Sequence, residues 1–221
     1  KNGGLQAIRQ EALNTYNKLG IPASRHEEWK YTRIAPLFNK EYQFQQAAPG
    51  KAEIEALRLP GHEEANELVF INGQLAFPLS NIRSAGLVVM PLEEAAINEY
   101  QAIVTEHLGH SSRYMKDGVN ALNTAFMQDG AFIHVPKGKV IDQPVYLYHI
   151  ADARQGNVLA QPRTLVHLAQ GAQLQLVEVF ATLGQQESFT NQVIEIVLEQ
   201  DAVAAHYKIQ QDAAHASQVS T

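Results

Sequence analysis

The chain has 221 residues, no cysteine, and a formal net charge of −6 from 17 Lys+Arg against 23 Asp+Glu. The length allows one large domain or two small ones. Without cysteine, these residues hold no disulfide, no thiolate zinc site and no cysteine-ligated iron–sulfur cluster. The acidic balance argues against nucleic-acid binding. The sequence also contains no recognisable membrane or export segment, so we expect a cytoplasmic protein.

The first elements are a helix and a hairpin. Apolar residues follow a 3–4 spacing over residues 5–19, with Gly20 at the position of a C-terminal cap and Pro22 after it. The Asn72-Gly73 pair lies between two apolar runs. Asn-Gly tolerates the positive φ angles of a two-residue turn, so we predict a hairpin over residues 68–77.

Two more helices and a strand complete the first part of the chain. A short strand is expected over residues 86–90, and Pro91 then opens a helix that extends to Val104. A further helix is expected over residues 113–128. We therefore predict a mainly helical α+β N-terminal domain over residues 1–128.

After Gly130 the helix signals stop and a repeat begins. Residues 133–139 match residues 166–172 at an offset of 33, and these match residues 196–202 at an offset of 30. The pattern of each unit predicts a strand, a tight turn and a second strand. A helix-free repeat of this size favours a parallel β-solenoid over residues 129–221, with a β-sandwich as the alternative.

The solenoid makes a register prediction that can be checked residue by residue. A shift of 30 places apolar residues beside apolar residues and an acid beside a base, as adjacent parallel strands favour. The predicted neighbours are Val177 with Tyr207, Val179 with Ile209, and Glu178 with Lys208.

Several motifs resemble those of one family. The run from Arg25 to Thr32, Arg-His-Glu-Glu-Trp-Lys-Tyr-Thr, resembles the signature of the SufB/SufD family, the scaffold subunits of SUF iron–sulfur cluster assembly. The similarity extends over essentially the whole chain. It also includes residues 121–126, 129–130, 135–138, 162–163, 189–191 and 206–208.

The resemblance implies a right-handed parallel β-helix after the helical region and a non-catalytic scaffold role. It implies a SufB-like partner and a SufC-type ATPase, with an iron–sulfur cluster or flavin only in the assembled complex and none bound by this segment. The lack of cysteine resembles the SufD branch. Family members are roughly twice as long, so we expect the first coils of a β-helix truncated at its C-terminus. The family's functional histidine and ATPase-binding domain then lie beyond residue 221.

Some histidines have spacings that metal ligands can share. His107 and His110 are three residues apart, but a solvated helix end is the simpler interpretation. His134 and His167 share a position in successive repeats and could stack on one solenoid face, where a soft divalent metal or plain outward-facing polar positions are the alternatives. His206 falls opposite Leu176, so the column does not continue. We therefore assign no catalytic, cofactor or metal residue.

Three other hypotheses remain at this point. A carbohydrate-active β-helix enzyme would need carboxylates or basic groups clustered on one solenoid face, whereas the candidate carboxylates are scattered. Homodimerisation through the β-helix is a second alternative. The run from Arg25 to Tyr31 could bind a partner, or Trp29 and Tyr31 could pack this linker against the body. The scattered carboxylates are Asp142, Asp152, Glu178, Glu195 and Glu199.

Overall fold

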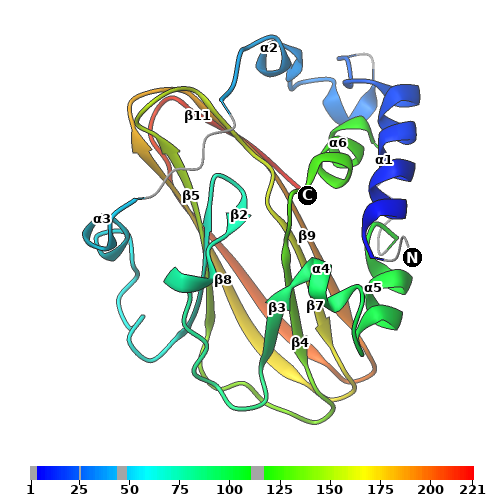
Figure 1. Cartoon of the computed structure of the whole chain (residues 1–221), viewed down its shortest axis with the longest axis vertical. Helices are drawn as coiled ribbons and strands as arrows, with labels where there is room; N and C mark the ends of the chain where they lie inside the picture. The colour runs from blue at the N-terminus through cyan, green and yellow to red at the C-terminus, as the bar shows by residue number, and fades with distance from the viewer. Residues whose placement is uncertain (1–3, 25, 44–48, 111–116) are drawn as a thin grey trace.

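The computed structural model describes residues 4–24, 26–43, 49–110 and 117–221 of the chain. Strands dominate it, and the helices are concentrated in the N-terminal half (Figure 1). The helices are α1 (Gln6–Leu19), α2 (Ala35–Phe38), α3 (Lys51–Glu55), α4 (Leu92–Ala95), α5 (Gln101–His107) and α6 (Gly118–Phe126), with 3₁₀ turns η1 (Glu27–Trp29) and η2 (Phe77–Leu79).

The strands form two facing sheets, each built mainly from parallel neighbours that belong to successive coils. One sheet has the order β10-β8-β5-β1-β2, and the other has the order β11-β9-β7-β4-β3, with β6 also paired to β9. The predicted parallel β-solenoid is confirmed. The strands are β1 (Asn66–Ile71), β2 (Gln74–Leu75), β3 (Val88–Pro91), β4 (Ala131–Val135), β5 (Val145–Ala153), β6 (Val158–Ala160), β7 (Arg163–Leu168), β8 (Gln173–Gly184), β9 (Ser188–Leu198), β10 (Val203–Gln211) and β11 (Ala216–Ser220).

The register predicted from the repeat is confirmed on both sheets. In the pairing of β8 with β10, Val177 lies beside Tyr207, Glu178 beside Lys208 and Val179 beside Ile209. In the pairing of β4 with β7, His134 lies beside His167. The repeat in the sequence is therefore the coil-to-coil stacking of the solenoid.

The turns of the repeat also stack. Gly138, Gly171 and Asp201 occupy the same place in successive units and have φ angles of 68°, 68° and 60°. The Gly138 amide donates to the Gln170 carbonyl oxygen at 2.8 Å, which ties one turn to the next. Glycine suits this left-handed backbone because it has no Cβ.

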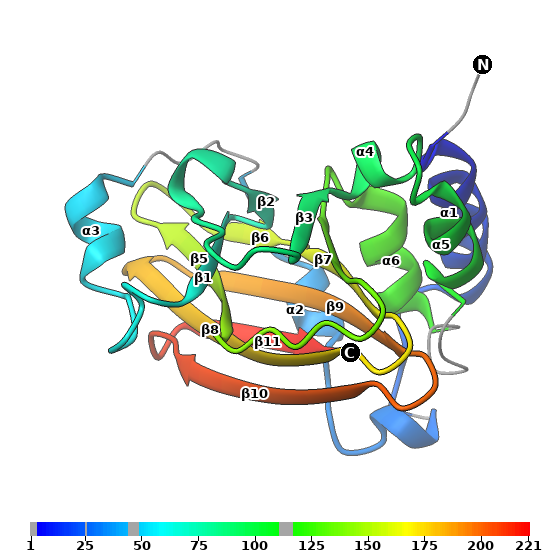
Figure 2. The same cartoon turned by 90° about the horizontal axis from the view of Figure 1, so that it is seen from below.

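Three apolar layers hold the solenoid and its cover together. The central layer fills the space between the two sheets and includes Leu68, Ile133 and Leu176. A second layer lies between β4, β7 and the helices α1, α4 and α5. A third lies between α3 and the outer face of β1, β5 and β8. Figure 2 shows α3 on one side of the solenoid and α1, α5 and α6 on the other.

The predicted hairpin is present but shorter, and it is part of the solenoid sheet. Asn72 and Gly73 have φ angles of 50° and 84°, as the predicted turn requires. β1 pairs antiparallel with β2 and also parallel with β5. Residue 77 belongs to η2 and not to a strand. The hairpin thus forms the first level of one sheet.

The helix expected from Pro91 to Val104 is two short helices, α4 and α5. The Asn98 side-chain oxygen accepts a hydrogen bond from the Tyr100 amide at 2.9 Å, and this local bond replaces helical pairing at the break. The helix expected over 113–128 is α6. Asp117 caps its first turn through the Asn120 amide at 2.7 Å, while residues 113–116 lie outside the described part.

Candidate functional site

A buried carboxylate lies inside the solenoid. Glu178 is fully buried and faces the interior between the sheets, where earlier coils carry leucine: Leu68 and Leu147 precede it in the same column. His149 Nε2 lies 3.1 Å from Glu178 Oε1, and His206 Nε2 lies 2.9 Å from Oε2. Because a carboxylate only accepts hydrogen bonds, both imidazoles donate from Nε2.

Two further groups complete this cluster, which we call the Glu178 cluster. The Gln192 side-chain amide donates to Glu178 Oε1, and Lys208 Nζ lies 3.7 Å from Oε2. Burial acts to raise the pKa of Glu178, but the hydrogen bonds from His149 and His206 outweigh it and lower that pKa to about 2. The predicted acid–base neighbours thus form a larger cluster that holds an anion in the core.

A second buried network fastens the helices to the solenoid. Arg163 on β7 is fully buried and forms an ion pair with Glu195 on β9. Arg163 Nη1 donates to Thr124 Oγ1 at 2.7 Å and to Asn123 Oδ1 at 3.2 Å, both on α6. The Gly109 amide, just after α5, donates to the Glu195 carboxylate at 3.0 Å. One ion pair therefore holds two helical segments on the strands.

The two histidines singled out by the repeat lie under the helical cover. His134 Nδ1 and His167 Nδ1 are 3.0 Å apart, and the two rings stack with centroids 5.1 Å apart. The residues are only 8% and 3% exposed, so they face outward from the coil but not into solvent. Burial, with a smaller contribution from the neighbouring imidazole, lowers the pKa of His134; burial is also the main cause of the lowered pKa of His167.

His107 and His110 do not act as a pair. The His107 ring stacks on the His167 ring with centroids 5.8 Å apart, so it belongs to the histidine stack, whereas His110 is exposed. Within the described ranges, no group of three or more His, Cys, Asp or Glu side chains is arranged to hold a metal ion.

The charged run around the single tryptophan places one of its two aromatic side chains in solvent. Tyr31 is 90% exposed, so the packing expected of Tyr31 is wrong. Trp29 is the last residue of η1, and its backbone amide donates to the His26 carbonyl oxygen at 2.9 Å. Lys30 Nζ lies 5.4 Å from the centre of the Tyr31 ring. Arg25 lies outside the described residues.

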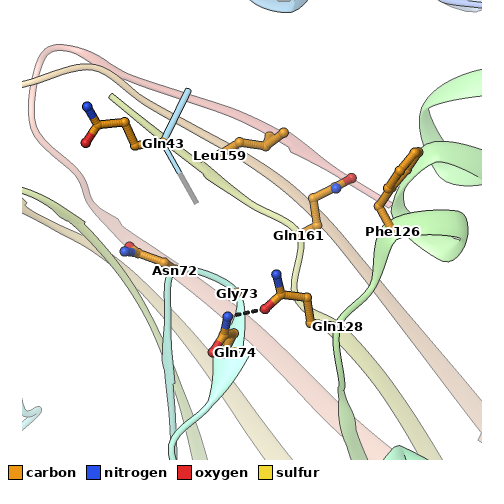
Figure 3. A pocket seen from close by; sticks show the side chains of 8 residues that line it. All are labelled: Gln43, Asn72, Gly73, Gln74, Phe126, Gln128, Leu159 and Gln161. Atoms are coloured by element: carbon orange, nitrogen blue, oxygen red, sulfur yellow. Dashed lines mark hydrogen bonds between the residues drawn. The ribbon is translucent and has the colours of Figure 1, made fainter. Parts of the chain in front are cut away.

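A small polar pocket lies where β2, the end of α6 and the segment after β6 meet (Figure 3). The Gln74 and Gln128 side chains bond to each other across it, and Gln161 accepts a hydrogen bond from Asn191 at 3.3 Å. The Asn72 side-chain oxygen accepts a hydrogen bond from the Asp152 backbone amide at 2.7 Å. The pocket contains no ionisable side chain among its described lining residues, and they supply no group for acid–base chemistry.

The five scattered carboxylates do not converge. Asp142 is exposed, and Glu199 is half-exposed beside His167. Asp152 is paired with Arg154. Glu178 and Glu195 are buried in the two separate networks described above. This arrangement lacks the open pair of carboxylates that glycoside hydrolysis requires.

Two models of protein families together match almost the entire chain. The SufBD protein N-terminal region model matches residues 2–147, and the SUF system FeS cluster assembly SufBD core domain model matches residues 149–221. The chain belongs to the SufB/SufD family. The resemblance seen in the sequence motifs is confirmed.

Two curated relatives match this SufB/SufD family member. An iron–sulfur cluster assembly SufBD family protein of Synechocystis sp. is 27% identical over 96% of this chain and 49% of that protein. The iron–sulfur cluster assembly protein SufD of Escherichia coli is 25% identical over 90% of this chain and 45% of that protein. The chain thus spans about half the length of the curated relatives it matches.

The motifs that carry the family resemblance include part of the buried network. Arg163, Asn123 and Asn191 all lie within the motif segments, and Asn191 Nδ2 donates to the Val119 carbonyl oxygen on α6 at 3.0 Å. Sequence reasoning assigned these residues no role, and it did not find His149 or Gln192. His149 could have been found because it is a polar residue at an inward-facing position of a mostly apolar strand.

Of the helices in the described ranges, none combines the length and apolarity needed to cross a bilayer.

Proposed function

We propose that this SufB/SufD family member acts as a SufD-type, non-catalytic scaffold in iron–sulfur cluster assembly in the cytoplasm. The observation that carries the proposal is the match of the core-domain model to the solenoid at residues 149–221, together with the SufD relative. We propose that the assembling cluster binds in the complete complex and not on this segment, because these residues include no cysteine to supply a thiolate. We propose the same location for any flavin.

The arrangement of ionisable groups supports a scaffold more than a hydrolase. Glu178 is fully buried and bonded to two imidazoles, and Glu195 is buried against Arg163. A general acid or nucleophile must reach a substrate, which neither carboxylate can do in this fold. The remaining role of these groups is to hold strands and helices in place. A carbohydrate-active enzyme is therefore the weaker candidate.

A rigid solenoid suits a scaffold because each coil contacts only its neighbours and the stack keeps its shape. We propose that the full-length protein pairs with a SufB-like subunit and binds a SufC-type ATPase. An alternative with the same fold is a homodimer. The scaffold proposal predicts that the full-length protein forms a complex with the other two subunits, whereas the alternative predicts a complex of two copies of this protein.

Co-expression tests the proposal directly. The full-length protein is expressed with the SufB-like and SufC-type subunits of its own source, and the complex is analysed by size-exclusion chromatography with light scattering. We expect one species that contains all three chains. A protein that elutes alone or only as a homodimer, while the other two subunits associate, would contradict the scaffold proposal. Polysaccharide cleavage that Glu178→Gln abolishes would instead favour the enzyme.

A further inference from the structure

The stacked histidines join the solenoid to its helical cover. His134 lies on β4 and His167 on β7, and neither is part of the inner core. Tyr100, which precedes α5, packs on the His134 ring with centroids 5.2 Å apart, and His107 on α5 packs on His167. The segment from α4 to α5 thus lies directly over the two imidazoles.

The geometry limits how many protons the pair can hold. His167 Nε2 lies 3.3 Å from Glu199 Oε1, and a carboxylate accepts, so this nitrogen carries a hydrogen. A neutral His167 therefore offers its Nδ1 lone pair to the Nδ1 hydrogen of His134. At 3.0 Å there is no room for a second hydrogen between these two nitrogens. The pair can take up one added proton, at His134 Nε2, and keep this contact. A second added proton would place a hydrogen on both Nδ1 atoms, so the rings must separate when both imidazoles are charged.

The surrounding groups do not remove this constraint. Glu199 and, more weakly, Glu106 on α5 favour a positive His167, but their side chains are 48% and 75% exposed and therefore solvated. The His107 imidazole acts against a positive His167. On β3, the neighbour of His134 is Val88, and Tyr100 contributes a phenol. The lowered pKa values of both histidines agree with a pair that is neutral when covered.

We propose that the His134–His167 pair is a proton-sensitive latch, which holds the segment from α4 to α5 on the solenoid at neutral pH and releases it when the medium becomes mildly acidic. This inference is independent of the proposed assembly role. The expected release is local because β8 is held separately, by the Glu178 cluster between the sheets, where His149 and His206 donate to the buried carboxylate.

The sign of the pH effect follows from linkage. A histidine whose folded pKa is below its unfolded value of about 6.5 contributes stability that is complete above that value. The contribution is lost as the pH falls from about 6.5 toward the folded pKa. We call the equilibrium constant for release of the segment from α4 to α5 the opening constant. In that pH window it rises roughly tenfold per pH unit for each histidine that is protonated only in the open form.

Hydrogen exchange followed by mass spectrometry tests the latch on the full chain. Exchange is measured at about pH 7.5 and about pH 5.5 and normalised to intrinsic amide rates, because this range spans histidine titration. We expect protection of α5 to fall roughly tenfold at the lower pH, while β8 stays protected. Equal protection of α5 at both pH values, or equal loss in β8, would overturn the proposal.

A pair of variants assigns the effect to the latch. His167→Phe keeps an aromatic ring against His107 but cannot take up a proton, so the acid-induced loss at α5 should disappear. His215→Phe removes an exposed histidine elsewhere and should leave the loss intact. If His167→Phe does not fold, the wild-type exchange pattern still decides the proposal. A loss of wild-type size in folded His167→Phe would contradict it.

Discussion

Arg163 and Glu195 form a fully buried ion pair that connects neighbouring coils and also holds the helices. Arg163 binds two side chains of α6, and Glu195 binds the Gly109 amide after α5. A buried charge without its partner is strongly unfavourable, whereas a matched pair can be replaced at little cost. The pair therefore makes the position of the helices depend on two residues of the solenoid.

The ion pair predicts a strongly non-additive mutant cycle. We expect Arg163→Met or Glu195→Gln alone to lower the free energy of unfolding by about 3–5 kcal/mol, because each leaves a buried partner unmatched. The double variant should cost clearly less than the sum of the two. Urea unfolding measures all three. Lys40→Met, which breaks the exposed pair with Glu187, is the control and should have a much smaller effect. Additive losses would contradict the coupling.

The Glu178 cluster predicts acid sensitivity in a defined pH range. The pKa of Glu178 is lowered from 4.5 to about 2, so the ionised carboxylate contributes stability that is complete above about pH 4.5. That contribution, about 3 kcal/mol at roughly 1.4 kcal/mol per pKa unit, is lost as the pH falls from 4.5 toward 2.

Glu178→Gln tests this contribution. The variant should be less stable at neutral pH and should show a flatter dependence of unfolding free energy on pH between 4.5 and 2. Urea unfolding at a series of pH values measures both. Glu187→Gln, which changes a carboxylate at the surface, is the matched control. A wild-type pH slope in Glu178→Gln would be inconsistent with the assigned pKa.

Gly73 is favoured by its positive φ angle and by the lack of space for a Cβ. Gly61 shares only the first of these two features, so it is a control for the second. The φ of Gly73 is +84°, and a Cβ there would lie 2.5 Å from the backbone nitrogen of Gln161. Gly61 has a similar φ of +81°, and a Cβ on it would meet no atom within 4 Å. Gly61→Ala should therefore cost only the left-handed backbone term of about 1–2 kcal/mol. Gly73→Ala should cost distinctly more in thermal unfolding, and equal costs would rule out the steric argument.

Tyr148 anchors the segment after α3 to the outer face of the solenoid. The Leu59 amide donates to its hydroxyl oxygen at 3.0 Å. Tyr148→Phe should lower the free energy of unfolding by about 1 kcal/mol, the usual net value of one hydrogen bond. Tyr146→Phe is the control, since its ring packs edge-on against Tyr148 with centroids 6.2 Å apart. Equal effects in urea unfolding would show that the hydrogen bond is unimportant.

Alkaline titration examines Tyr148 independently. Burial raises its pKa from 10.0 to about 12, despite the opposing hydrogen bond from Leu59. Its neutral form therefore contributes stability that is complete below pH 10 and is lost as the pH rises toward 12. In a spectrophotometric titration, the tyrosine that titrates near pH 12 should be absent from Tyr148→Phe and present in Tyr146→Phe.

The repeat and the motifs were enough to predict the solenoid, its register and the family resemblance. Side chains stack coil on coil, so a repeat offset of 30 or 33 residues is also a spatial neighbour relation, and Glu178 beside Lys208 could be predicted from it. Local turn chemistry likewise placed Asn72-Gly73 correctly. These features depend on contacts between equivalent positions or between near neighbours in the chain.

The packing of the helices against the solenoid could not be predicted from the repeat or from local sequence. Whether His134 and His167 face solvent depends on a helical segment far from them in the chain, which the repeat does not encode. Gln192 reaches Glu178 from the opposite sheet, and Arg163 on the solenoid reaches Thr124 on α6. Such contacts join residues that are far apart in the chain. They determine which polar side chains are buried and paired, and therefore which of them stabilise the fold.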